Sequence, residues 1–179
     1  MANLMVNTPQ PNLDSVLHGE MAPGFMGLLL GQLVDRLVEA GNGPADAAGI
    51  RAPVRSFSML ILLAGGDQSV TELAKRLGVT HAAVIKTART LDGLGFLGRG
   101  DDPADARRKP LGLTADGRRE AALVATYMTR VSEVYREMFD EIGVDLFAAV
   151  CAFEGALQRE GFASRFDRAR SEPRGDTRD

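Results

Sequence analysis

The sequence predicts a mainly α-helical protein with one short β-hairpin, and two observations carry this prediction. Apolar residues recur at intervals of three and four over most of residues 23–157, which is the period of an amphipathic helix. The exceptions are two short runs, residues 96–99 and 110–113, which flank the charged, turn-forming stretch GDDPADARRK. Such an arrangement is typical of the two strands of a hairpin. We therefore expect helices on both sides of a small β-hairpin.

The N-terminal part of the chain predicts two helices. The first is expected over residues 23–40 and to end at residues 41–44 (GNGP), because glycine past a helix end and a following proline are stop signals. Pro53 fits the first turn of a second helix that continues over residues 54–64, since the missing N–H of proline has no helical partner there. Residues 1–19 contain two prolines and no sustained period, which indicates a flexible arm.

Two short helices joined by a tight turn are expected next. Ser69 and Glu72 fit a capping box, in which each side chain accepts a hydrogen bond from the other residue's backbone N–H. The helix that they open ends at Gly78, and Thr80 is the expected N-cap of the following helix, which reaches Gly95. Two short helices with a glycine in the turn between them are typical of a helix-turn-helix.

A long helical region follows the hairpin, with Thr114 as its expected N-cap. Apolar residues along it recur at roughly heptad spacing, which is typical of helices that pair with one another. These residues are Val124, Tyr127, Val131, Val134, Met138 and Ile142. We interpret this seam as the core of a dimer, and a ligand site on the same stripe is the alternative. Gly143 separates the seam from a final amphipathic helix over residues 146–157.

Residues 75–120 form a basic segment in an acidic protein. The segment contains ten basic and six acidic residues, whereas the whole chain has a net charge of −3. A local excess of positive charge is expected of a phosphate-binding surface, although a solvated charged face has the same composition. Arg118 and Arg119 allow the same two interpretations, because cations near a helix start oppose the helix dipole.

The second helix of the helix-turn-helix is the candidate DNA-reading element. Residues near the N-terminus of such a helix reach base edges in the major groove, and its positive end favours a phosphate. An arginine at a hairpin tip can enter a narrow minor groove, and Asp105 is placed to hold such an arginine in a bidentate pair. The candidate DNA-binding residues are Thr80, His81, Ala82, Ala83, Lys86, Arg89, Arg107, Arg108 and Lys109.

The stretch TELAKRLGVTHAAVIKTARTLDGLGFLGR, followed by DARRKPLGLTADGR, resembles the core of the MarR family of winged-helix regulators. The wing pattern of that family is Asp-x-Arg followed, after a short gap, by Leu-x-Leu-Thr. Here it reads Asp105-Ala106-Arg107 and then residues 111–114. The resemblance extends over about residues 55–120 and is weaker in the flanking helices.

The resemblance implies a winged helix-turn-helix with a helical dimerisation domain. It also implies a homodimer that binds pseudo-palindromic duplex DNA, usually as a repressor and often relieved by a small aromatic or phenolic ligand or by oxidation. By position, Arg107 is the minor-groove arginine and Asp105 supports it. Pockets of the family lie between the dimerisation helices and the DNA-binding lobe, so the candidate ligand-pocket residues are Arg55, Phe57 and Met59.

The reading helix departs from its relatives at Ala82 and Ala83, where they often carry a hydroxyl or an amide. Alanine can touch a thymine methyl group but cannot form hydrogen bonds with bases. Direct base readout by hydrogen bonds is then left to His81, Lys86 and Arg89.

The sequence predicts neither a metal site nor a cofactor nor an enzyme. His81 and His18 are the two histidines, and we find no Gly-rich phosphate loop, Gly-x-Ser-x-Gly turn or Cys-His pair. We interpret Cys151 as a small hydrophobe on the apolar face of the last helix, with a redox-sensor role as the alternative. No apolar run approaches the roughly 20 residues that span a bilayer, and no signal peptide is recognised. A cytoplasmic protein without disulfides is therefore expected.

The expected organisation is an N-terminal arm, a dimerisation helix and loop, a winged helix-turn-helix DNA-binding domain, C-terminal dimerisation helices and a disordered tail. Their respective ranges are residues 1–19, 20–50, 51–115, 116–165 and 166–179. The predicted function is that of a sequence-specific, homodimeric, DNA-binding transcriptional regulator. The alternative is a winged-helix module that docks other proteins, which the acidity of the whole chain permits and which does not need the basic wing.

Overall fold

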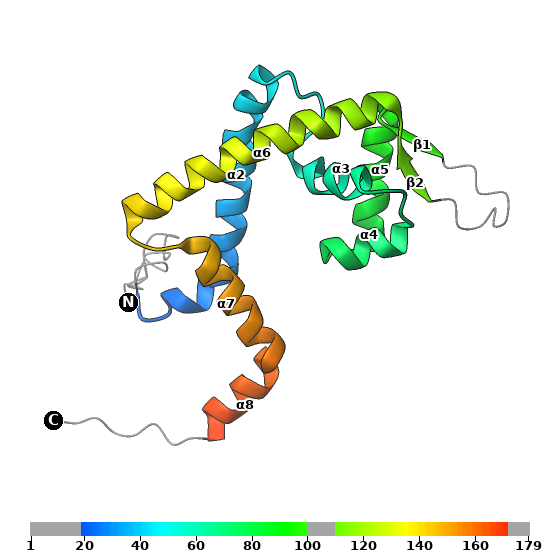
Figure 1. Ribbon diagram of the computed structural model, residues 1–179. Coiled ribbons are helices and arrows are strands. Elements are labelled where there is room, and N and C mark those ends of the chain that lie inside the picture. The colour runs from blue at the N-terminus through cyan, green and yellow to red at the C-terminus, as the bar shows by residue number, and fades with distance from the viewer. Residues whose placement is uncertain (1–18, 100–109, 172–179) are drawn as a thin grey trace, which may run out of the picture. The chain divides into compact units, whose positions relative to one another are not determined.

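The computed structural model describes residues 19–99 and 110–171 (Figure 1). The elements follow the order η1 (Ala22–Phe25), α2 (Met26–Ala47), η2 (Val54–Ser56), α3 (Phe57–Ala64), α4 (Val70–Leu77), α5 (His81–Gly93), β1 (Leu97–Arg99), β2 (Leu111–Leu113), α6 (Ala115–Ile142), α7 (Leu146–Arg159) and α8 (Phe162–Ser171). The predicted fold class is confirmed, because helices flank a two-stranded antiparallel hairpin. The chain forms two compact units, one that ends at Tyr127 and one that begins at Met128.

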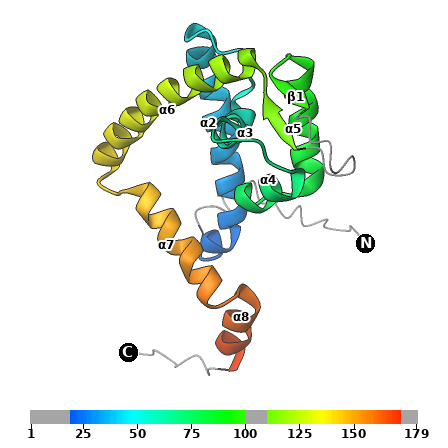
Figure 2. The same cartoon turned by 45° about the vertical axis from the view of Figure 1, so that its right-hand side comes forward.

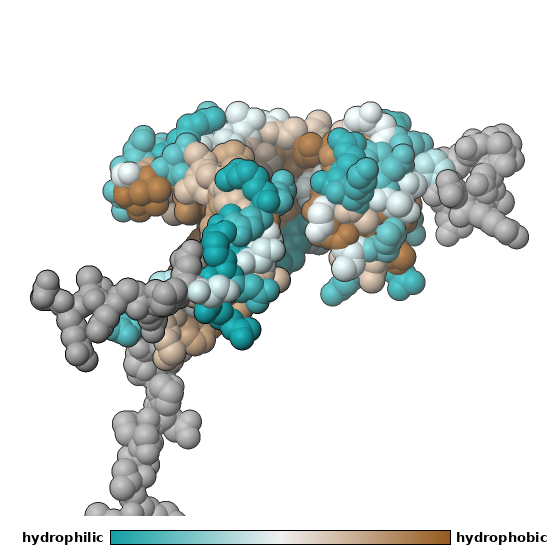
Figure 3. All heavy atoms as spheres, turned by 90° about the horizontal axis from the view of Figure 1, so that it is seen from below, coloured by the Kyte–Doolittle hydropathy of each residue, from teal (hydrophilic) through white to brown (hydrophobic). Residues whose placement is uncertain are grey.

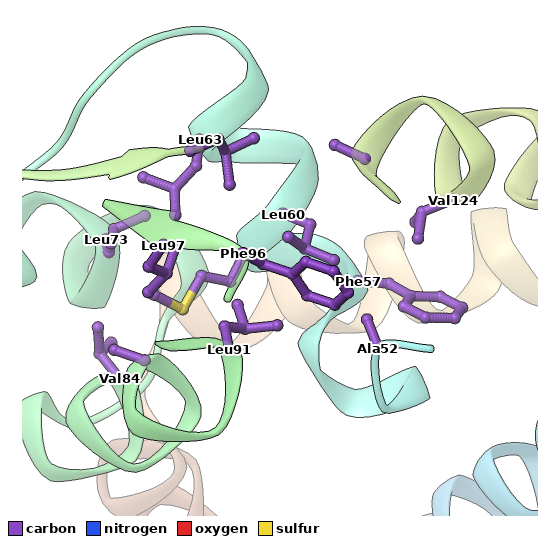
Figure 4. Packing of buried hydrophobic residues seen from close by; sticks show 14 of the residues in the cluster. Ala52, Phe57, Leu60, Leu63, Leu73, Val84, Leu91, Phe96, Leu97 and Val124 are labelled. Carbon is purple, nitrogen blue, oxygen red and sulfur yellow. The ribbon is translucent and has the colours of Figure 1, made fainter. Parts of the chain in front are cut away.

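The core of the first unit brings together α3, α4, α5, the hairpin and the first turns of α6 (Figure 4). Its largest fully buried side chains are Phe96, Met59, Leu60, Leu73, Leu91, Val84 and Val124. Full burial of one such side chain contributes about 1.5–3 kcal/mol to stability. Figures 1 and 2 show α5 and β1 side by side, and these two elements are in contact.

The capping box at the start of α4 is confirmed. The Glu72 N–H donates to Ser69 Oγ at 3.2 Å, and the Ser69 N–H donates to Glu72 Oε2 at 2.8 Å. The hydrogen bonds from the Ser69 backbone and hydroxyl stabilise the Glu72 carboxylate and lower its pKa. Gly78 closes the helix with φ of +65°, a left-handed conformation that glycine adopts without strain.

Thr80 and Thr114 are the N-caps of α5 and α6, as the sequence predicts. Thr80 Oγ1 accepts from the Ala83 N–H at 3.2 Å, and Thr114 Oγ1 accepts from the Gly117 N–H at 3.0 Å. The Thr114 hydroxyl also donates to the Gly95 carbonyl at 2.8 Å. The second cap therefore ties the start of α6 to the segment between α5 and β1.

The predicted end of the first long helix is wrong. The helix continues through residues 41–44 to Ala47, with Pro44 inside it. Tertiary contacts explain this, because the Tyr127 hydroxyl donates to the Gly41 carbonyl at 3.0 Å and Ala45 is buried in the core. Local stop signals are weak compared with packing of this kind, so they are overridden here.

The hairpin pairs Leu97 with Leu113 and Arg99 with Leu111, so each strand is one residue shorter than predicted. Leu111 also forms an antiparallel bridge with Gln68, through backbone hydrogen bonds of 3.0 and 2.8 Å. The Gln68 side chain is held in turn, since its Nε2 donates to the Leu62 carbonyl at 2.7 Å. The segment before α4 thus supports the base of the hairpin.

The second unit contains the end of α6, then α7 and α8. Asp145 caps α7, because its Oδ1 accepts from the Ala148 N–H at 2.8 Å. Arg165 joins the two last helices by donating to the carbonyls of Ala156 at 2.9 Å and Glu160 at 3.0 Å. Residues 166–171, expected to belong to a disordered tail, are instead helical. None of the residues of α7 and α8 is buried.

Gly117 and Gly93 provide a matched pair for testing the packing of the first unit. A Cβ at Gly117 would overlap the carbonyl oxygen of Phe96, whereas a Cβ at Gly93 meets nothing within 4 Å. Gly117→Ala is therefore expected to destabilise the protein by about 1–3 kcal/mol, as overpacking does. Gly93→Ala is expected to stabilise it by up to about 1 kcal/mol, because alanine has the higher helix propensity. Urea unfolding measures both, and changes of the same sign would contradict the described packing.

Candidate nucleic-acid interface

The α5 helix is anchored through one side and exposed on the other. Its residues Val84, Ala88 and Leu91 are buried together with Leu73 and Ala74 of α4. Packing of two short helices in this way is typical of a helix-turn-helix. The predicted base-reading side chains all lie at the surface, and they are His81, Ala82, Ala83, Lys86 and Arg89. The structure thus places these five residues on the solvent side of α5.

His81 is held toward α4. Its Nε2 atom lies 3.3 Å from Thr71 Oγ1 in the first turn of that helix. The imidazole therefore already has one hydrogen-bonding partner within the protein. Its predicted contact with a base remains a prediction, and that contact would use the other ring nitrogen or replace the hydroxyl of Thr71.

Ile85 is a surface residue of α5 that the sequence analysis did not identify. Its exposed fraction is 40%, although isoleucine is usually buried. It lines a cavity of about 190 Å³ together with Val70, Leu97 and Leu111. A signal was available, since Ile85 follows Ala82 by three residues and precedes Arg89 by four, and these intervals place residues on one helix face.

The wing residues Asp105, Arg107, Arg108 and Lys109 lie outside the described residues. The base of the hairpin is described, and Arg118 contributes to it. The Arg118 guanidinium donates to the Leu113 carbonyl at 2.7 Å. This hydrogen bond within the protein corresponds to neither of the two predicted roles of Arg118, a phosphate contact and a solvated charged face. Arg119 instead forms an exposed ion pair with Asp116 one turn earlier.

Glu120 is a buried carboxylate that the sequence analysis also missed. Only 3% of its surface is exposed, and its Oε1 accepts from the Arg51 N–H at 2.5 Å and the Ala52 N–H at 2.7 Å. The Arg51 guanidinium lies over the ring of Phe96, 4.7 Å from its centre. Glu120 therefore fixes the connection after α2 against the start of α6 and the end of α5. Its sequence signal is its position four residues before Val124, the first residue of the predicted seam.

The three candidate ligand-pocket residues do not share an exposed site in a single copy of the chain. Phe57 and Met59 are buried in the core, where the rings of Phe57 and Tyr127 pack in a T-shaped arrangement at a centroid distance of 5.8 Å. Arg55 is exposed and pairs with Asp35 at 2.5 Å. The pocket itself remains a prediction.

The predicted burial of Cys151 is wrong for the single chain, because this side chain is exposed on α7. Among the described residues no cluster of three or more His, Cys, Asp and Glu side chains is arranged to hold a metal ion. Within the same ranges, no helix combines the length and the apolar character that a membrane span requires.

Comparison with known proteins agrees with this architecture. Residues 53–108 match the model of the MarR family. Comparison with curated proteins finds no similar sequence. Among solved structures, the transcriptional repressor CouR bound to a 23-mer DNA duplex is 23% identical, with 76% of this chain and 94% of that chain covered and a TM-score of 0.59.

Two further structures are similar. A MarR-family transcriptional regulator from Rhodococcus sp. RHA1 is 24% identical, with 80% of this chain and 99% of that chain covered and a TM-score of 0.54. The adhesin competence repressor AdcR from Streptococcus pyogenes is 22% identical, with 75% and 96% covered and a TM-score of 0.54. The fold is that of a winged helix-turn-helix protein with flanking helices. Within this class, the similarity to the MarR family lies in the domain that residues 53–108 span.

Removal of the Glu120 carboxylate tests its role in holding the connection after α2. Glu120→Ala leaves two backbone donors without an acceptor, and each such buried group costs about 1–3 kcal/mol. Glu120→Gln keeps one acceptor oxygen and is expected to lose less stability than Glu120→Ala. The exposed Glu133 on the same helix supplies the control Glu133→Ala. Urea unfolding that gives Glu120→Ala and Glu133→Ala equal stability would refute the role.

Proposed function

We propose that the protein is a homodimeric transcriptional regulator that binds pseudo-palindromic duplex DNA, most simply as a repressor. The observation that carries the proposal is the MarR-family winged helix, in which α5 is anchored by Val84 and Leu91 and exposes its opposite side. Each α5 enters a major groove, and half-sites one helical turn apart match the symmetry of the dimer. The CouR structure, in which a repressor of this fold is bound to a DNA duplex, supports the same assignment.

The proposed DNA contacts divide between two elements. Thr80 and the exposed residues of α5 face the major groove, where Lys86 and Arg89 supply positive charge. Arg107, Arg108 and Lys109 contact the backbone or the minor groove from the wing, with Asp105 holding Arg107. The excess of basic residues over acidic ones between residues 75 and 120 supports this division.

A second copy of the chain is the proposed partner of the second unit. The first part of the predicted seam, Val124 and Tyr127, packs within its own chain, whereas Val134, Met138 and Ile142 are about half exposed. Large apolar side chains continue along α7, with Phe147 and Phe153 at the surface. Figure 3 shows residues of high hydropathy, in brown, at the molecular surface. Dimer interfaces of the obligate kind are apolar in this way, because they resemble a domain core divided in two.

The proposal includes three further points that the sequence analysis raised. The protein has no enzymatic activity of its own, in keeping with a family of transcriptional regulators. It acts in the cytoplasm. A small effector that changes the distance between the two reading helices releases DNA, since both helices must dock at once.

Salt dependence tests the DNA-binding role of the wing. Arg107→Ala is expected to weaken binding to every duplex and to flatten the dependence of log K on log salt by about one unit for each phosphate that the arginine neutralises. Arg36→Ala, on an exposed position of α2, is the control and is expected to leave the slope unchanged. Fluorescence anisotropy titrations across a series of salt concentrations measure both. Wild-type binding that ignores salt would refute the proposed electrostatic contribution of the wing.

The proposed dimer is tested at α7. Phe153→Asp places a charge on a side chain that is 55% exposed in one copy, so the fold of the chain is expected to survive. An interface across α7 would not accept this charge, and sedimentation velocity is then expected to show monomers. Ile61→Asp on α3, at a position 40% exposed, is the control and is expected to remain dimeric. Phe153→Asp protein that still sediments as a dimer would exclude α7 from the interface.

A further inference from the structure

We infer that α5 reads its half-site chiefly through thymine methyl groups, by an apolar patch formed by Ala82 and Ile85. This inference rests on the proposed function and specifies the DNA that the site selects. The half-sites should carry thymines at the positions that face the first two turns of α5.

The position of the patch follows from the burial of the helix. Val84, Ala88 and Leu91 fix which side of α5 faces the core. Ala82 and Ile85, together with Lys86 and Arg89, follow the spacing i, i+3, i+4 and i+7 that aligns residues along one helix face. All four are exposed. Ala83 is exposed as well, but it lies two positions from Ile85, a spacing that places the two residues on different sides of the helix. A duplex that docks on this face meets the methyl and aliphatic groups of Ala82 and Ile85 beside the charged side chains of Lys86 and Arg89.

Hydrogen-bonding side chains on the same turns are largely engaged within the protein. The imidazole of His81 is held by Thr71 at 3.3 Å, and the Thr80 hydroxyl accepts from the Ala83 N–H. The Thr90 hydroxyl donates to the Lys86 carbonyl at 3.3 Å. Lys86 has a charged ammonium group without the planar, two-pronged geometry that distinguishes bases best. Arg89, whose guanidinium has that geometry, lies two turns after Ala82. Polar readout is therefore weak in the first turns of α5, where the apolar patch lies.

The chemistry of the major groove selects the base that fits such a patch. Guanine, adenine and cytosine present acceptors or donors along their edges, and an apolar side chain placed against these groups leaves them unpaired. Thymine adds a C5 methyl group, which is the apolar feature of the groove. Ile85 also borders the apolar wall formed by Val70, Leu97 and Leu111. A thymine methyl group that packs beside Ile85 is thus transferred from water to an apolar surface, and this surface continues to the hairpin.

The experiment begins with selection of bound sites from random duplex DNA by the full-length protein. Each thymine of a selected half-site is then replaced by uracil, which removes the methyl group and keeps the base pair. Loss of one buried methyl is expected to weaken binding about fourfold, and loss in both half-sites about fifteenfold. Uracil in place of thymines outside the half-sites is the control and should leave affinity unchanged.

A variant of the protein locates the contact. Ile85→Ala should reduce the uracil penalty at the thymine that Ile85 touches, since the methyl then has no aliphatic partner. Ile61→Ala, on α3 with the same exposed fraction of 40%, should keep the full penalty. Circular dichroism verifies that both variants are folded.

The outcomes separate this inference from the proposed function. Sequence-dependent binding with no uracil penalty, or selected half-sites without thymine, overturns the inference and leaves the proposed function intact. A uracil penalty that is equal in wild-type and Ile85→Ala protein at every thymine removes Ile85 from the patch and overturns the inference as stated. Absence of any sequence-dependent binding overturns both.

Discussion

The packing of α5 against α4 and Phe96 is the constraint on which the rest of the first unit depends. Leu73, Val84, Leu91 and Phe96 are fully buried, so α5 cannot rotate about its axis without exposing apolar surface. The residues on its opposite side are fixed by the same burial. A reading surface made of short side chains such as Ala82 needs this anchoring, because short side chains cannot reach toward a base as a flexible lysine does.

A second constraint fixes what surrounds α5. Glu120 binds two backbone N–H groups of the connection after α2, and Arg51 in that connection lies over Phe96. Thr114 ties the start of α6 to Gly95. The residues that follow α2, end α5 and begin α6 are therefore joined by hydrogen bonds and by a cation–π contact rather than by apolar packing alone. Such directional contacts have one favourable geometry, which makes this junction stiffer than an apolar contact of the same size.

The features that the sequence predicts well are those with local causes. The capping box at Ser69, the caps at Thr80 and Thr114 and the turn at Gly78 each depend on residues within four positions, and all are present. The errors have distant causes. The helix through Pro44 depends on Tyr127, more than eighty residues away, and the burial of Glu120 depends on the backbone near residue 51. Periodicity places Glu120 on the apolar face but cannot supply its partners, so a glutamate there resembles a surface residue.

The exposure of the second unit has a different explanation from the exposure of α5. Side chains such as Phe147 and Phe153 are large and apolar, and water is a poor environment for them, whereas Ala82 and Ala83 lose little by remaining in contact with water. The first set therefore calls for a partner that covers it continuously, as the proposed second copy of the chain would. The second set suits a partner that binds reversibly, because a small exposed apolar area destabilises the free protein only slightly. The helix α6, which runs from Ala115 to Ile142, contributes residues to both units.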